Sequence, residues 1–91
     1  MTGATIYFCT EKTLNTPIQY TPPISVRIDE LKNIKFAIAQ LLTADNPALQ
    51  PRIHNIEGNI VNIKMIDTHR GTELETGTTI TAKLQIIACG D

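Results

Sequence analysis

Between residues 80 and 86, apolar and polar side chains alternate at every position. The apolar positions are Ile80, Ala82, Leu84 and Ile86, and the polar positions between them are Thr81, Lys83 and Gln85. Successive side chains of a β-strand point to opposite faces of the sheet. This run therefore predicts a strand in a sheet that has one face on a hydrophobic core and the other face in water.

Four other stretches have the composition of strands. Residues 4–10 are mostly apolar, β-branched or aromatic, and residues 17–20 predict a return strand that Pro17 confines to a sheet edge. Residues 52–56 and 61–65 also alternate, and the Glu57-Gly58-Asn59 segment between them is typical of a tight turn. We therefore expect a hairpin there, and the polar segment that follows it predicts a loop.

An amphipathic helix is predicted from about residue 29 to residue 42. Asp29 is a favourable N-cap, and Glu30 lies where the helix dipole favours negative charge. The apolar residues that follow are spaced so that one face of a helix would carry all of them: Leu31, Ile34, Ile38, Leu41 and Leu42. Asn46-Pro47 is expected to stop the helix.

The predicted order of two strands, one helix and three strands indicates an α+β fold. Its economical form is a mixed sheet of four or five strands packed on the single helix. This layout resembles the ubiquitin-like β-grasp superfamily. The resemblance rests on an opening strand Thr5-Ile6-Tyr7-Phe8, the return strand, the helix, the hairpin and a closing stretch from Leu74 to Ile86, and it involves no invariant motif.

The resemblance also implies one candidate functional position, Gly90. Conjugated ubiquitin-like modifiers end in a tail whose last residue is a glycine, which is activated at its carboxylate. This chain departs from that pattern, because it has one glycine in place of a pair and Asp91 follows it. Conjugation through Gly90 would require removal of Asp91, and the alternative is that Gly90-Asp91 is a frayed terminus.

Length and charge narrow the classes of function. The chain has 91 residues, which favours a single domain over residues 1–91. Eight basic and nine acidic residues give a net charge of −1, and no basic cluster predicts binding to nucleic acid or an anionic membrane. No apolar run is long enough to span a bilayer, and the N-terminal residues lack the pattern of a signal peptide. A cytoplasmic protein is expected.

Cys9 and Cys89 lie near opposite ends of the chain, which excludes a C-x-x-C motif. Two interpretations remain open. Both residues are reduced and pack as small apolar side chains, or they form a disulfide, which requires that their strands be neighbours.

The sequence predicts no enzyme, cofactor or metal site. His54 and His69 have no second ligand at metal-binding spacing, and no phosphate-binding or nucleophile motif occurs. Asp67 precedes His69 by two positions, but a catalytic dyad also needs a nucleophile and an oxyanion site. Lys64, His69 and Arg70 form either a solvated basic spot or a contact for an acidic partner.

Three hypotheses about function follow. The first is a non-catalytic ubiquitin-like interaction domain or small adaptor that binds another protein through a sheet face or strand edge. The second is a structural or assembly protein, for example a viral or secretion-system component, that forms homo-oligomers through strand edges near Pro17 or the terminal strand. The third is an enzyme with a site at Asp67 and His69, which the lack of a pocket there would exclude.

Overall fold

The structure, a computed structural model, describes residues 8–15 and 17–91, and within these ranges it contains strands, turns and loops. The strands in chain order are β1 (Phe8–Asn15), β2 (Ile18–Gln19), β3 (Ile24–Arg27), β4 (Ile34–Ala44), β5 (Leu49–Glu57), β6 (Ile60–Asp67), β7 (Thr72–Glu73), β8 (Thr79–Ile80) and β9 (Ala82–Gly90).

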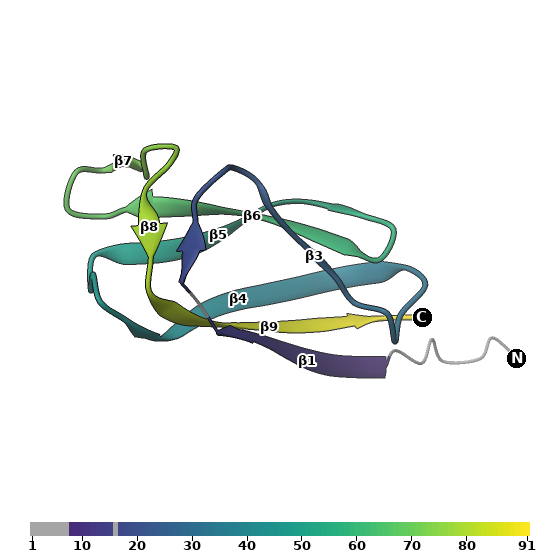
Figure 1. The fold of residues 1–91 in the computed structure, drawn as a ribbon. Helices are drawn as coiled ribbons and strands as arrows, with labels where there is room; N and C mark the ends of the chain where they lie inside the picture. Colours follow the sequence, from purple (N-terminus) through teal and green to yellow (C-terminus); the bar gives the residue numbers. More distant parts are fainter. Residues whose placement is uncertain (1–7, 16) are drawn as a thin grey trace, which may run out of the picture.

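Two antiparallel sheets lie face to face in a β-sandwich (Figure 1). One sheet has the strand order β1-β9-β4. The other has the order β3-β6-β5, with β7 paired to the end of β6. The short pair β2–β8 lies at the end of the sandwich opposite the C-terminus (Figure 1).

The core is formed mainly by the central strand of each sheet. The inward side chains of β9 are Ala82, Leu84, Ile86 and Ala88, and those of β6 are Val61, Ile63 and Met65. All seven are buried in one cluster. Each large aliphatic side chain removed from water in this way contributes about 1.5–3 kcal/mol to folding. The strand predicted from the alternation between residues 80 and 86 is confirmed for residues 82–86, which belong to β9. Ile80 belongs instead to β8, which pairs with β2, and Thr81 lies between the two strands.

The helix predicted for residues 29–42 is wrong. Residues 29–33 form turns and bends, and residues 34–44 form β4, the longest strand. The described residues contain no helix long and apolar enough to cross a membrane.

The physical reason for this error is that β4 is apolar on both faces. Ala37, Ala39 and Leu41 pack against the core, while Phe36 and Ile38 point away from it and are exposed. Since Phe36 and Ile38 occupy outward positions where an ordinary half-exposed strand has polar residues, the period of two disappears from this part of the pattern. The spacing of the remaining large side chains then matches a helix.

The α+β class and the β-grasp layout are therefore corrected to an all-β sandwich. In the described residues a second sheet, and not a helix, covers the β1-β9-β4 sheet. The expected hairpin is confirmed, because β5 and β6 are joined at Gly58, whose φ of 61° suits glycine. The return strand is only the two residues of β2, and β2 pairs with β8 instead of β1. Of the opening strand predicted for residues 4–10, residues 4–7 lie outside the described residues, and β1 continues to Asn15.

Tyr20 ties the β2–β8 pair to strands β6 and β7 of the second sheet. Its ring is fully buried, its hydroxyl donates to Glu73 Oε1 at 2.9 Å, and the Met65 backbone N–H donates to the same hydroxyl at 3.0 Å. Its backbone N–H donates to the carbonyl of Thr78, and its carbonyl accepts from Gly77. Burial is the main cause that raises the pKa of the Tyr20 hydroxyl; Glu73 raises it further, while the Met65 N–H lowers it.

Candidate functional site

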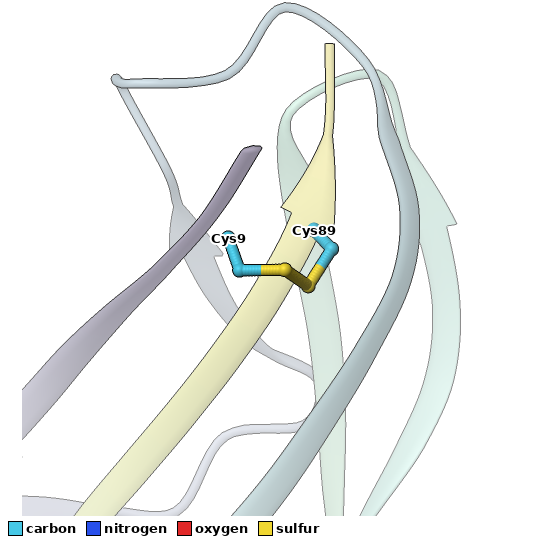
Figure 2. Close-up of a disulfide and its surroundings, with 2 residues drawn as sticks. All are labelled: Cys9 and Cys89. Carbon is cyan, nitrogen blue, oxygen red and sulfur yellow. A yellow bond between two sulfur atoms is a disulfide. The ribbon is translucent and has the colours of Figure 1, made fainter. Parts of the chain in front are cut away.

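The outer face of the β1-β9-β4 sheet, which points away from the second sheet, carries the disulfide between Cys9 and Cys89 (Figure 2). The two residues lie directly opposite each other on β1 and β9, and their Cα atoms are 4.0 Å apart. Cys89 is buried although it is not part of the core cluster, whereas Cys9 is exposed. The sequence leaves open whether Cys9 and Cys89 are reduced or form a disulfide, and in the structure they form a disulfide.

Side chains on this outer face form rows across the three strands. Reading from β1 to β4, the strand registers define the rows Cys9, Cys89, Phe36; then Glu11, Ile87, Ile38; then Thr13, Gln85, Gln40. The first two rows are largely apolar and the third is polar. Directly opposite residues on one face contact each other, so the face has an apolar half beside a polar half.

Amide side chains connect the polar half into a ladder. Gln40 Nε2 donates to Gln85 Oε1 at 2.5 Å, and Gln85 Nε2 donates to Glu11 Oε2 at 2.9 Å. A primary amide offers two N–H donors and one carbonyl acceptor, and within the described residues Gln40 uses one N–H. The ladder therefore ends at β4 with an acceptor and a donor still available.

The large apolar side chains that are exposed concentrate on β4. Among the described residues there are four such side chains: Phe8, Phe36, Ile38 and Leu42. The last three are on β4, and Ile38 is the most exposed of these three, at 59%. We call Phe36, Ile38 and Leu42 the β4 cluster. Single exposed apolar residues are common on protein surfaces, but three on one strand make β4 the candidate interaction surface of the described residues.

β4 is also an edge strand whose far side is unpaired after Ile34, whose N–H donates to the Gly58 carbonyl at 2.8 Å. It pairs with β9 on one side, and no described strand pairs with it on the other. Alternate residues of an antiparallel strand direct their N–H and C=O groups away from the neighbour. The register with β9 is regular from Phe36 to Leu41, between irregularities near Lys35 and Leu42. This stretch presents open hydrogen-bonding groups next to the β4 cluster.

The other edges carry features that oppose pairing. β1 has Glu11 and Lys12, and the Lys12 ammonium donates to the Arg27 carbonyl of the opposite sheet at 3.1 Å. β3 has only four residues, and β5 contains Pro51 and a register irregularity next to His54. Charge, short length, proline and bulges are the usual devices that protect sheet edges from association. The regular part of β4 has no charged residue and no proline.

Gly90 does not lie in a free tail. It is buried at the end of β9, opposite Phe8 of β1 and Ile34 of β4. A Cβ atom at this position would collide with the Asn33 carbonyl oxygen. Asp91 is held as well, because its N–H donates to Asn33 and its carbonyl accepts from Lys32 and Asn33. The glycine is needed for this close approach of two backbones, and conjugation through it stays a prediction.

The candidate dyad of Asp67 and His69 is not formed through the imidazole ring. Asp67 Oδ1 accepts instead from the backbone N–H groups of His69 at 3.0 Å and Arg70 at 3.3 Å, which fixes the turn after β6. A hollow of about 240 Å³ beside the turn is lined in part by Asp67 but not by His69. His54 is exposed on β5, which pairs with β6 in the same sheet. In the described part of the chain, no group of three His, Cys, Asp or Glu residues is placed to hold a metal ion.

The predicted basic spot is divided between two places. Lys64 is in the middle of β6, whereas His69 and Arg70 are exposed in the turn beyond its end. Arg70 forms an exposed ion pair with Glu75 at 3.8 Å, a type of contact that contributes little. The structure therefore does not bring Lys64 together with His69 and Arg70 as one site for an acidic ligand.

No family model, curated protein sequence or solved structure matches this chain. The candidate site is therefore defined by its geometry: an edge strand whose regular part, Phe36 to Leu41, is uncharged and carries exposed apolar side chains, next to an amide ladder and a disulfide. Sequence reasoning missed this site because it assigned Phe36 and Ile38 to a helix. The available signal was a run of seven uncharged residues, Phe36 to Leu42, that is apolar at every position except Gln40.

Proposed function

We propose that this chain is a non-catalytic protein-binding domain that accepts a β-strand from a partner along the free edge of β4. In strand addition, main-chain hydrogen bonds supply affinity and the side chains beside the edge supply specificity. The observation that carries the proposal is that three of the four exposed large apolar side chains of the described residues lie on this one edge strand.

The contrast between the sheet edges supports this function. Three edges carry charge, proline, a bulge or a very short strand, whereas on β4 the charge of Lys35 and two register irregularities flank a regular stretch, Phe36 to Leu41, that is uncharged and mostly apolar. An unprotected apolar edge promotes aggregation if it stays bare. A strand that is covered by a partner in its working state does not need such protection.

Selection of random peptides of 11 residues, the length of β4, tests the proposal while the natural partner is unidentified. Selected peptides are expected to bind the wild-type domain and to slow amide hydrogen exchange in β4. Ile38→Lys should abolish this binding because it places a charge on the apolar edge. Thr13→Lys, which adds the same charge to an exposed position on β1, is the matched control and should leave binding unchanged. Selected peptides that protect another strand, or that bind Ile38→Lys equally well, would contradict the proposal.

We also propose that the domain works in an oxidising compartment. The support is the Cys9–Cys89 disulfide, since such bonds persist in exported proteins and are rare in the cytosol. The cytoplasmic location predicted from the sequence stays a prediction, and the disulfide argues against it. Rapid thiol alkylation of the native host cells, followed by mass spectrometry, separates the two locations. An unalkylated protein supports the proposal, and alkylation of both cysteines would overturn it.

A further inference from the structure

We infer that the strand added to β4 is β4 of a second copy of this chain, paired antiparallel about a twofold axis at Gln40. This inference rests on the proposed function, because it names the occupant of the same edge. In a twofold contact, each residue on one side of the axis meets the residue equally far on the other side of it in the second copy. In a strand suited to this contact, the residue a given number of positions before the axis must therefore be complementary to the residue the same number of positions after it.

Two of the three members of the β4 cluster have this complementarity, while the third, Phe36, would face Ala44. Ile38 is two positions before Gln40 and Leu42 is two positions after it, and both side chains are exposed. Antiparallel pairing centred on Gln40 brings Ile38 of each copy next to Leu42 of the other, at the point where the register of β4 with β9 becomes irregular. Directly opposite apolar side chains on one sheet face stabilise the pairing of two strands.

The charges that flank β4 follow the same symmetry. Counted along the sequence, Lys35 is five positions before Gln40, at the first register irregularity of β4, and Asp45 is five positions after it, one residue beyond the end of β4. Both residues are exposed, and neither forms an ion pair within the described residues. The twofold pairing brings Lys35 of each copy near Asp45 of the other, which gives two attractive contacts at the ends of the interface.

The amide ladder also reaches its open end at the axis. Gln40 donates one N–H to Gln85 and, in the described structure, retains its carbonyl oxygen and second N–H. Two such amides facing each other across a twofold axis form a reciprocal pair of hydrogen bonds. The ladder from Glu11 through Gln85 to Gln40 would then continue across both copies as one row.

One centre satisfies all three features. A centre at Ala39 places Lys35 opposite Thr43, and a centre at Ile38 places Lys35 opposite Leu41. The agreement of apolar, charged and amide groups on Gln40 favours a second copy of the chain over an unrelated strand. The net charge of −1 also makes long-range repulsion between two copies weak.

Cysteine cross-linking tests this register. Directly opposite residues have Cα atoms about 4.5–5.5 Å apart, within the range that a disulfide spans. Gln40→Cys is therefore expected to form a covalent dimer under mild oxidation. Ile38→Cys, on the same face of the same strand, is the matched control. Its two copies would be four positions out of register, about 13 Å apart, and should not cross-link. Proteolytic mapping must show that Cys9 and Cys89 remain paired in both variants.

A charge exchange provides the second test and does not depend on an added thiol. Lys35→Asp should weaken the dimer roughly tenfold, because it replaces two attractive contacts with two repulsive ones. The double variant Lys35→Asp/Asp45→Lys should restore the wild-type dissociation constant measured by analytical ultracentrifugation. A wild-type protein that stays at the 10.0 kDa mass of one chain at all concentrations, cross-linking through Ile38→Cys, or no rescue by the double variant would each overturn the inference.

These outcomes are separate from those of the peptide selection. If the chain is monomeric and Gln40→Cys does not cross-link, but selected peptides still protect β4, then the strand-addition function stands and the second-copy inference fails. If peptides also fail to protect β4, then the proposed function fails as well.

Discussion

Cys9 lies directly opposite Cys89 across the β1–β9 ladder, so the disulfide joins an edge strand to the central strand of its sheet. The two residues are 80 positions apart in the chain. A cross-link of this span removes much of the conformational freedom of the unfolded chain, and the loss of chain entropy corresponds to a stabilisation of about 4–5 kcal/mol.

We therefore expect the Cys9→Ser/Cys89→Ser variant to lose about 2–5 kcal/mol in the free energy of unfolding, measured with urea. The control is the wild-type protein in excess reductant, which should unfold at nearly the same urea concentration as the variant. Equal stability of the oxidised wild type and the variant would contradict the structural role of the disulfide.

Tyr20→Phe removes the acceptor of the Met65 backbone N–H and the donor to Glu73, while it keeps the buried ring. A buried amide without an acceptor costs about 1–3 kcal/mol, and we expect a loss of stability of that size in urea unfolding. Ser25→Ala is a comparison, because its hydroxyl bonds Asn62 in a part-buried position where the loss should be smaller. A neutral effect of Tyr20→Phe would mean that water satisfies the Met65 N–H.

Alkaline pH should act through the same residue. The folded-state pKa of Tyr20 is raised above the ordinary tyrosine value of 10.0, chiefly by burial. A raised pKa favours the protonated, folded form, so this contribution to stability is complete below pH 10.0 and is lost as the pH rises through the folded-state pKa.

The chain has two tyrosines, so in a Tyr7→Phe background the ultraviolet absorbance of tyrosinate reports on Tyr20 alone. The expected midpoint is higher in the folded protein than in urea. Identical midpoints would contradict the burial of the Tyr20 hydroxyl.

Gly90→Ala tests the close contact between β9 and the residues that precede β4. The new methyl group would collide with the Asn33 carbonyl oxygen, and both backbones would have to move. We expect a loss of roughly 2–4 kcal/mol, in the range of overpacked interiors or more. Gly71→Ala is the control, because its φ of 73° disfavours alanine but no atom lies within 4 Å of the added Cβ. Gly71→Ala should lose about 1–2 kcal/mol in the free energy of unfolding. An equal or smaller loss of stability in Gly90→Ala would contradict the close contact between Gly90 and Asn33.

The strands that obey simple alternation could be predicted from the sequence. Leu84 and Ile86 of β9 pack inward while Lys83 and Gln85 point outward, and Gly58 forms the predicted turn between β5 and β6. These elements have polar residues on the side that faces water, so their period of two is visible.

The part that could not be predicted is the part that bears the candidate site. A strand with Phe36 and Ile38 on its exposed face breaks the pattern that identifies a strand, because it is apolar on both sides. If a partner covers that face, the sequence of β4 was selected for two apolar environments, the core and the interface. The sequence of β4 then resembles an amphipathic helix, because its outward apolar residues match the surface of a partner and not water.

The sharpest test of strand addition at β4 is amide hydrogen exchange, compared between wild-type protein and Ile38→Lys at the same high concentration. We expect alternate amides from Phe36 to Leu41 to exchange slowly in the wild type and quickly in Ile38→Lys. Amides of β1 should exchange equally in both, and Thr13→Lys should behave as the wild type. Equal exchange along β4 in the wild type and Ile38→Lys would show that nothing covers this edge, and would contradict strand addition there.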